Sequence, residues 1–387
     1  MFFKRFKGLA AIFVSMLLII QLFTFPIYAV GEHAPSLDLD CKIAILIEAT
    51  TGKVLYEQNA DEALPPASVT KVMTLLLVME AIEEGKIKLD DMVSASAHAA
   101  SMGGSQIFLE EGEEMSVEDM LKSVIIASAN DAACALAEYV SGSEEAFVAR
   151  MNERAGEIGM QNTKFENTNG LDDTAQNHLT SARDIAIMSA ELIKHEKILE
   201  YSSIWMDTVR DGEFGLTNTN RLIRFYRGCT GLKTGSTEKA GFCISATAER
   251  DGTKLIAVIM GAESRDIRNA AATKLLDWGF ANYAVYNHAS EILEGVKVSG
   301  GTKNSLIAEC QEFSSVVEKN KISCVEYKLD IPDEVSAPIK KGDVIGNVTF
   351  TLDGTEIGKV DVVATEDVER IGFFEIWLRI LSKFLLK

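Results

Sequence analysis

The sequence predicts an α+β fold: one sheet covered by helices, then a small all-β domain, then a C-terminal amphipathic helix. Strand-like runs lie near both ends of the first 286 residues, while the middle of that region has helical patterns. Short β-like runs separated by turn residues follow between about 291 and 366. The last segment, 370–387, has the apolar spacing of a helix.

The N-terminal segment 1–29 has the pattern of an export signal. Three basic residues precede an apolar run from Gly8 to Phe25, and Ala29 closes a suitable cleavage site. We expect cleavage after Ala29. An uncleaved N-terminal anchor is the alternative, because the apolar run is long for a signal peptide. In both cases the rest of the chain is exported.

The first domain is expected over residues 33–286 and begins with a hairpin. Its strands are Ile43–Ile47 and Lys53–Tyr56, with the turn near Thr51-Gly52. A helix is expected over 68–84, because Gly85 ends its apolar run. Further helices are expected at 116–127, where Ser116 opens a capping box, and at 131–140, 144–158, 181–194 and 266–281, with strands at 229–236, 241–249 and 254–261.

A second, small β domain is expected over residues 290–366. The composition changes near Asn287-His288, and turn residues such as those at 338–343 separate the β-like runs. These runs are Leu293–Val298, Cys324–Leu329, Val344–Phe350 and Ile357–Val363.

The segment 370–387 forms an amphipathic helix on a helical wheel. It is too short and too charged to span a bilayer comfortably. Four basic residues and one acidic residue give it a charge of +3 beside an acidic body. We expect it to lie in the membrane interface, where each basic group adds about 1 kcal/mol near an anionic surface. Packing against the second domain is the alternative. The apolar face is Phe373, Trp377, Ile380, Leu381 and Phe384, and the polar face is Glu375, Arg379 and Ser382, with Lys383 on the flank.

The charge of the chain argues against nucleic acid as a partner. The formal net charge is −19, and loss of the three basic residues of the export signal lowers it to −22. A nucleic-acid-binding domain needs a basic surface, which this composition does not favour.

The histidines and cysteines predict neither a metal site nor a cofactor. No C-x-x-C pair and no H-E-x-x-H motif occur. Cys229 with Cys243, and Cys310 with Cys324, are spaced as cross-strand neighbours, and export permits disulfides. We favour free, buried cysteines. The histidines are at 33, 98, 178, 195 and 288, and the cysteines at 41, 134, 229, 243, 310 and 324.

The stretch "PPASVTK" places Ser68 and Lys71 at the start of a buried helix. Residues at i and i+3 share a helix face, so the serine hydroxyl and the lysine amine come within reach of each other. A lysine whose pKa is lowered by burial or by a second cation can activate a serine as a nucleophile. Helix capping and a snorkelling lysine are the structural alternatives. The motif alone is weak, because the same spacing recurs at Ser236–Lys239.

Two further motifs strengthen this interpretation. Ser128-Ala129-Asn130 lies between two helical patterns, and Lys233-Thr234-Gly235 lies on a strand-like run. Singly, each is explained by an interhelical break or by a strand entering a turn. Together the order S-x-x-K, S-x-N, K-T-G, with each motif on a suitable element, indicates a serine acyl-transfer site.

These motifs make the chain resemble the low-molecular-mass penicillin-binding proteins, which are serine-type D-alanyl-D-alanine carboxypeptidases. The resemblance runs from about residue 33 to the C-terminus and rests on "PPASVTKVMTLLL", "SVEDMLKSVIIASANDAACALAE", "GLKTGSTEKAGFC" and "VIMGAESRDIR". It implies a β-lactamase/transpeptidase-like sheet covered by helices, and no cofactor. It also implies removal of the terminal D-alanine from peptidoglycan stem pentapeptides, covalent binding of β-lactam antibiotics, and a place outside the cytoplasm, attached peripherally to the outer face of the cytoplasmic membrane.

The resemblance assigns the chemical steps to particular residues. Ser68 would be the nucleophile, Lys71 its general base, and Ser128 would pass a proton to the departing amine. Backbone N–H groups of Ser68 and Ser236 would form the oxyanion hole, where one donor contributes roughly 3 kcal/mol in a hydrolase of another fold. Several relatives carry histidine where this chain has Ser236, a change that keeps the backbone donor.

The remaining site residues would bind the substrate. Asn130 would position Lys71 and the substrate amide, and Lys233 would add positive potential and hydrogen-bond Ser128. Thr234, beside Gly235, would receive the terminal carboxylate together with Arg268. Arg265 is the alternative to Arg268, and a surface role is possible for either arginine.

Three other functions fit the same motifs less well. A β-lactamase of this fold needs a further glutamate, for which Glu166 is the nearest candidate, but it lacks the expected sequence context. A DD-endopeptidase would use the same residues. A catalytically silent peptidoglycan-binding scaffold has no reason to keep all three motifs.

Overall fold

The computed structural model describes residues 37–172 and 175–385. The predicted export signal, 1–29, lies outside the described residues. The chain divides at Leu37, and the elements below all belong to the unit that begins at Asp38.

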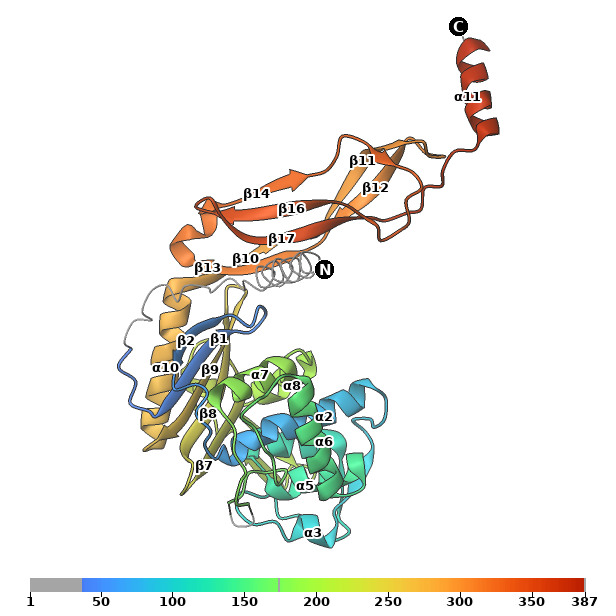
Figure 1. Cartoon of the computed structure of the whole chain (residues 1–387). Helices are drawn as coiled ribbons and strands as arrows, with labels where there is room; N and C mark the ends of the chain where they lie inside the picture. Colours follow the sequence, from blue (N-terminus) through green and yellow to red (C-terminus); the bar gives the residue numbers. More distant parts are fainter. Residues whose placement is uncertain (1–36, 173–174, 386–387) are drawn as a thin grey trace, which may run out of the picture. The chain divides into compact units, whose positions relative to one another are not determined.

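A five-stranded antiparallel sheet organises the first part of this unit (Figure 1). Its order is β2-β1-β9-β8-β7, so the N-terminal hairpin pairs with strands that lie two hundred residues later, as predicted. The side chains of β1 are buried along its whole length, which is expected of a strand covered on both faces. The strands are β1 (Ile43–Glu48), β2 (Val54–Gln58), β7 (Cys229–Thr237), β8 (Gly241–Arg250) and β9 (Thr253–Ala262).

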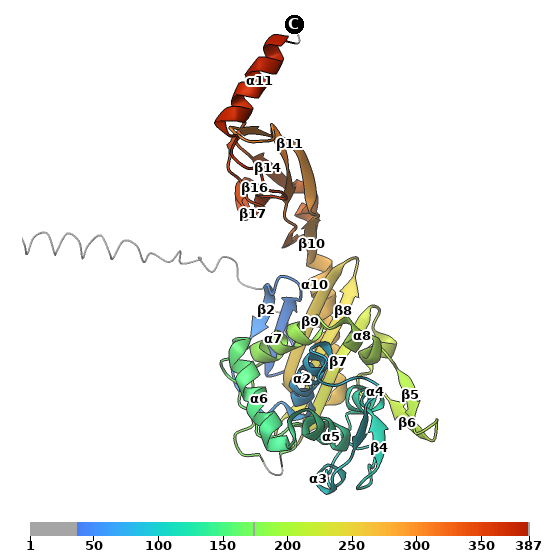
Figure 2. The ribbon, with the colours of Figure 1, turned by 90° about the vertical axis from the view of Figure 1, so that its right-hand side faces the viewer.

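Helices cover both faces of the sheet (Figure 2). On one face α10 (Arg265–Asn282) packs on β8 and β9, and Gly279 allows close approach, since a Cβ there would meet Leu46 and Leu255 at 2.7 Å. On the other face α7 (Ala182–Leu192) packs on β1 and β9, and α2 (Lys71–Glu83) packs on α7. The smaller elements are α3 (Ala97–Ala100), α4 (Val117–Lys122), α5 (Asn130–Ser141), α6 (Glu144–Glu157), α8 (Glu196–Ser202), α9 (Leu222–Phe225), β3 (Met92–Ser94), β4 (Glu114–Ser116), β5 (Met206–Val209) and β6 (Phe214–Thr217).

Two predicted helices differ from α-helices where the site lies. The helix expected over 68–84 begins as a 3₁₀ turn, Ala67–Thr70, before α2 starts at Lys71. The helix expected over 116–127 is α4 followed by a π turn, Ser123–Ala127. The cap was predicted correctly, because Ser116 Oγ accepts a hydrogen bond from the Asp119 N–H at 3.1 Å.

The β-rich part of the chain contains all four predicted strand runs. Strand β10 pairs with β13, and the other strands form a sheet of order β14-β16-β17-β12-β11-β15. Its core centres on Phe350, whose ring stacks on Phe313 at 4.1 Å between centroids. The strands are β10 (Tyr283–His288), β11 (Glu291–Ser299), β12 (Ser305–Cys310), β13 (Phe313–Glu318), β14 (Val325–Asp330), β15 (Val335–Ser336), β16 (Val344–Leu352) and β17 (Thr355–Ala364), with a 3₁₀ segment at Lys319–Cys324.

In the final helix, α11 (Phe373–Leu385), the apolar side chains as far as Leu381 are exposed. Phe373 is 86% exposed and Trp377 is 50% exposed. On its polar face the Arg379 guanidinium donates to Asn304 Oδ1 at 3.1 Å and to the Thr302 carbonyl. In the described ranges, no helix is both long and apolar enough to cross a membrane.

All six cysteines are free thiols, as favoured from the sequence. Cys229 stands opposite Ala248 and Cys243 opposite Gly235, so the first pair of cysteines does not face across the strands. Burial was predicted correctly for Cys134, Cys243 and Cys310 and wrongly for Cys324, which is exposed.

Candidate active site

Ser68 lies in the 3₁₀ turn between Pro66 and α2, facing strand β7. The turn and the strand are so close that a Cβ at Gly235 would stand 2.8 Å from the Pro66 carbonyl oxygen and from the Ser68 nitrogen. Real Cβ atoms do not approach backbone at that distance. Gly235 is therefore needed to bring the strand against the serine.

A buried histidine braces this turn. His178 Nδ1 accepts from the Glu166 N–H at 3.0 Å, so its Nε2 carries the proton and donates to Thr70 Oγ1 at 2.7 Å. Thr70 Oγ1 in turn donates to the Ala67 carbonyl at 2.8 Å. Burial lowers the pKa of His178 to about 4, so the imidazole is neutral near pH 7.

Lys71 is the first residue of α2 and is fully buried. Its Nζ lies 3.0 Å from Ser68 Oγ, 2.6 Å from Asn130 Oδ1 and 3.0 Å from the Asn169 carbonyl oxygen. Burial and the Lys233 charge hold the pKa of Lys71 well below its usual range, and Asp131 opposes them. A neutral amine beside a serine hydroxyl is the arrangement that a general base requires.

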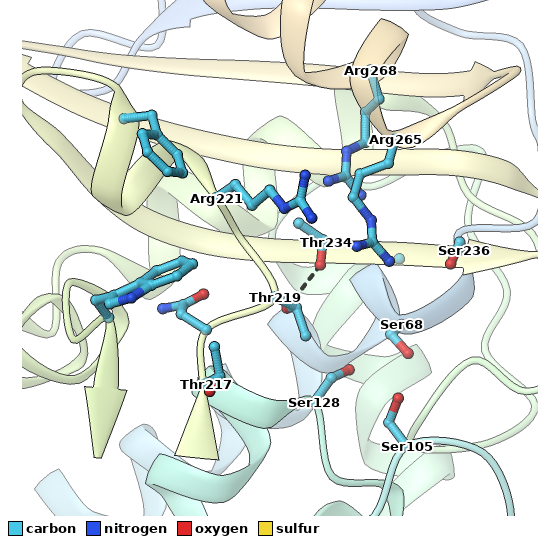
Figure 3. A pocket seen from close by; sticks show the side chains of 14 residues that line it. Ser68, Ser105, Ser128, Thr217, Thr219, Arg221, Thr234, Ser236, Arg265 and Arg268 are labelled. Atoms are coloured by element: carbon cyan, nitrogen blue, oxygen red, sulfur yellow. Dashed lines mark hydrogen bonds between the residues drawn. The ribbon is translucent and has the colours of Figure 1, made fainter. Parts of the chain in front are cut away.

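Ser128 and Asn130 come from the break between the π turn and α5. Ser128 has a left-handed backbone, φ 65°, which is strained for a residue with a Cβ and turns its hydroxyl toward Ser68 (Figure 3). Asn130 opens α5 and is fixed at both ends of its amide, because Nδ2 donates to the Gly103 carbonyl at 2.6 Å. The carboxylate of the next residue, Asp131, accepts the N–H groups of Ile107 and Leu109 at 3.1 and 3.0 Å.

Strand β7, at the edge of the sheet, contributes the third motif. Lys233 is buried, and burial with the Arg268 charge lowers its pKa to about 7. Its Nζ donates to the Thr234 carbonyl at 3.0 Å, and within residues 37–172 and 175–385 it makes no direct hydrogen bond to Ser128. Thr234 Oγ1 donates to Thr219 Oγ1 at 2.8 Å.

These residues line a pocket of about 620 Å³ (Figure 3). One part of it is lined by the serines of the first two motifs and by Thr234, Gly235 and Ser236. Both Arg265 and Arg268 also reach it. Arg268 is buried and Arg265 is exposed. Because both line the pocket, both remain candidates for binding the terminal carboxylate. The other lining residues are Ser105, Trp205, Thr217, Asn218, Thr219, Arg221 and Phe225.

Comparison with known proteins agrees with this geometry. Residues 29–264 match the D-alanyl-D-alanine carboxypeptidase family, peptidase S11. The chain belongs to this family. Residues 280–370 match the C-terminal domain of penicillin-binding protein 5. The predicted fold class and the predicted serine D-Ala-D-Ala carboxypeptidase activity are thereby confirmed.

Individual carboxypeptidases are similar over most of their length. The chain is 44% identical to D-alanyl-D-alanine carboxypeptidase DacF of Bacillus subtilis, over 91% of this chain and 92% of that protein. It is 37% identical to carboxypeptidase DacC of Escherichia coli, over 91% and 90%. The crystal structure of penicillin-binding protein 5 from Haemophilus influenzae superposes with a TM-score of 0.75 at 32% identity, covering 86% of this chain and 98% of that one.

The position of Glu166 does not suit a β-lactamase in this carboxypeptidase. Its carboxylate accepts the N–H groups of Gln176 and Asn177 at 2.8 and 3.0 Å and bonds Lys164 at 3.1 Å. It is not among the lining residues of the pocket. A glutamate held in this way is not free to activate a deacylating water next to Ser68.

Several site residues were missed in the sequence. Asn169 supplies only a backbone carbonyl to Lys71, and His178 affects Ser68 only indirectly, through Thr70 of the turn that it braces. Arg221 reaches the pocket from a loop with no recognisable motif. Asp131 is the one residue with a sequence signal, because an acid in the first turn of a helix is a common feature.

Proposed function

We propose that this carboxypeptidase removes the terminal D-alanine from peptidoglycan stem pentapeptides through an acyl-enzyme on Ser68. The observation that carries the proposal is the 3.0 Å contact between Lys71 Nζ and Ser68 Oγ, with the amine buried beside a second lysine. Neutral Lys71 takes the Ser68 proton as Oγ attacks the penultimate carbonyl carbon. The oxyanion is stabilised by the N–H groups of Ser68 and Ser236.

Collapse of the tetrahedral intermediate breaks the peptide C–N bond. Ser128, whose hydroxyl faces Ser68 in the pocket, passes a proton to the departing D-alanine amine. Water then attacks the ester, with Lys71 again as base, and releases the shortened stem. Asn130 keeps Lys71 in place, and Lys233 supplies the charge that depresses its pKa.

The leaving residue is bound through its carboxylate. Thr234 and Arg268 line the same pocket as Ser68, and a guanidinium with a hydroxyl suits a carboxylate. Arg268 already donates to Asn269 Oδ1 through Nε and Nη2, which holds the guanidinium in one orientation. Exposed Arg265 supplies additional charge at the pocket.

We also propose that the protein acts outside the cytoplasm on the outer face of the cytoplasmic membrane, held there by α11. The exposed apolar side chains of α11 and its net positive segment support interfacial binding. We propose the same domain limits that we inferred from the sequence. The catalytic domain spans 33–286, the small β domain 290–366 and the membrane-associating segment 370–387.

Intact-protein mass spectrometry after brief exposure to a penicillin tests the proposal, with Ser68→Ala beside the wild type. We expect a drug-sized mass gain that is lost in the variant, together with D-alanine release from a D-Ala-D-Ala peptide by the wild type alone. An unmodified wild type that leaves the drug intact would indicate a silent scaffold. An unmodified wild type that consumes the drug would indicate a β-lactamase.

A further inference from the structure

The described residues that line the pocket supply three guanidinium groups and no carboxylate. Arg221, Arg265 and Arg268 all line it, and none of the other lining residues in the described ranges is acidic. The three guanidinium groups lie near one another beside Thr234 (Figure 3). Burial and the charges of its two neighbours lower the pKa of Arg268 to about 10. The arginines therefore repel one another without compensation from the pocket wall.

The protein itself neutralises this cluster only weakly. Arg221 Nη1 is 3.9 Å from Asp266 Oδ1, and the Asp266 side chain is 90% exposed, so the pair contributes little. In the part of the chain that the structure describes, the Arg265 guanidinium has no hydrogen-bond or ion-pair partner. Arg268 is the one member with fixed contacts, to Asn269 and to the Cys243 carbonyl.

A peptide that ends in D-alanine brings a single carboxylate to this cluster. Thr234 and one arginine suffice to bind it. The same pocket also contains Trp205 and Phe225, whose rings meet edge to face with centroids 6.4 Å apart.

In the proposed binding mode, the other two arginines lie beside the leaving residue. Thr234 and Arg268 are proposed to hold the carboxylate of that residue, and Arg221 is grouped with them in Figure 3. With the carboxylate held in this way, we expect the side chain of the leaving residue to reach Arg221. The methylene groups of a longer side chain would contact the two aromatic rings. An anionic group at the end of that side chain would neutralise the charge of the remaining arginines.

We propose that Arg221, Trp205 and Phe225 form a subsite for the side chain of the leaving residue, and that this subsite, besides admitting D-alanine, favours a D-residue with a second carboxylate over an uncharged residue of the same size. The inference rests on the proposed function, because the chemistry is the same acyl transfer. Ser68 Oγ bonds to the D-alanyl carbonyl carbon, the C–N bond breaks, and the acidic D-amino acid leaves as a protonated amine. Water then hydrolyses the ester.

Three peptides that differ only in their last residue test this subsite. They are diacetyl-L-lysyl-D-Ala followed by D-Ala, D-Glu or D-Gln, and D-Glu and D-Gln differ in charge at nearly equal size. For the wild type we expect kcat/KM for the D-Glu peptide to exceed that for D-Gln about fivefold. Arg221→Gln should bring this ratio close to one, whereas Arg221→Lys should keep most of it.

Arg227→Gln is the matched control, since it removes the same charge from an exposed arginine that does not line the pocket. Its D-Glu to D-Gln ratio should equal that of the wild type. A wild type that does not prefer D-Glu, or an Arg221→Gln ratio equal to that of the wild type, would overturn the subsite. Penicillin labelling of each variant verifies its fold. Absence of D-alanine release from the D-Ala peptide would instead refute the proposed function.

Discussion

Lys71 Nζ donates a hydrogen bond of 2.6 Å to Oδ1 of Asn130, a residue that lies 59 positions later in the chain. An amide oxygen fixes the amine without carrying a charge, so it positions Lys71 and does not favour the ammonium form as a carboxylate would. Among the described residues, Asp131 is the acid that raises the pKa of Lys71, and backbone N–H groups already occupy its carboxylate.

Asn130→Asp should therefore slow acylation of Ser68 by penicillin. A carboxylate at this contact raises the pKa of Lys71, which protonates the base near neutral pH, and we expect a loss of about 100-fold at pH 7. The higher pKa of Lys71 shifts the acidic limb of the pH–rate profile to higher pH. The loss should therefore shrink as the pH rises and Lys71 becomes neutral again. Stopped-flow labelling across pH measures this, and Asn320→Asp on an exposed segment is the control. An unmoved acidic limb would contradict the role given to Asn130.

Lys233→Met should abolish activity and stabilise the protein. Burial lowers the Lys233 pKa from 10.5 to about 7 in the folded chain. Below about pH 7 the folded state therefore bears the full cost of a buried ammonium, and this cost disappears as pH rises toward 10.5. We expect the variant to gain ~1–2 kcal/mol at pH 7, with a smaller gain at pH 10.

Urea unfolding at both pH values measures this difference, with exposed Lys328→Met as the control. A Lys233→Met protein less stable than the wild type at pH 7 would mean that the buried ammonium is compensated by contacts other than those described.

Gly235→Ala should separate strand β7 from the 3₁₀ turn that carries Ser68. The added Cβ would lie 2.8 Å from the Ser68 nitrogen and 2.9 Å from that of Val69, so the strand must move. Misplacement by about 1 Å costs on the order of 100-fold in rate, and overpacking costs roughly 1–3 kcal/mol of stability. Gly215→Ala is the control, because a Cβ there meets nothing within 4 Å. Equal acylation rates for the two variants would refute the argument.

Trp377→Glu should release the protein from membranes. A charge on the exposed apolar face of α11 opposes burial in the interface, and losing one large apolar side chain weakens binding by about tenfold or more. Ser382→Glu adds the same charge to the polar face and should have a smaller effect. Flotation with anionic phospholipid vesicles compares the two. If both variants float like the wild type, α11 is not the membrane contact.

The sequence was sufficient where a residue acts through its own side chain on a regular element. Ser68, Lys71 and Lys233 were proposed because three short motifs occur in a recognisable order, and periodicity placed Lys71 on a helix and Lys233 on a strand. Short elements such as β5 and α9 were missed, since runs of four residues carry too little periodicity. Arg221 was missed with them, because a loop residue has no register that predicts which cavity it will face.

The pairing of β1 with β9 also determines when the site can exist. Ser68 belongs to the first fifth of the chain. Strand β7, which it faces, is synthesised much later, and so are β8 and β9, the two strands that connect β7 to the N-terminal hairpin in the sheet. Ribosomes deliver the chain from its N-terminus, so the serine emerges long before its partners. Every nascent fragment that ends before β9 therefore carries the nucleophile without a closed sheet. Reactivity toward peptides and antibiotics is thus acquired in one late step, when the strands after residue 229 close the sheet.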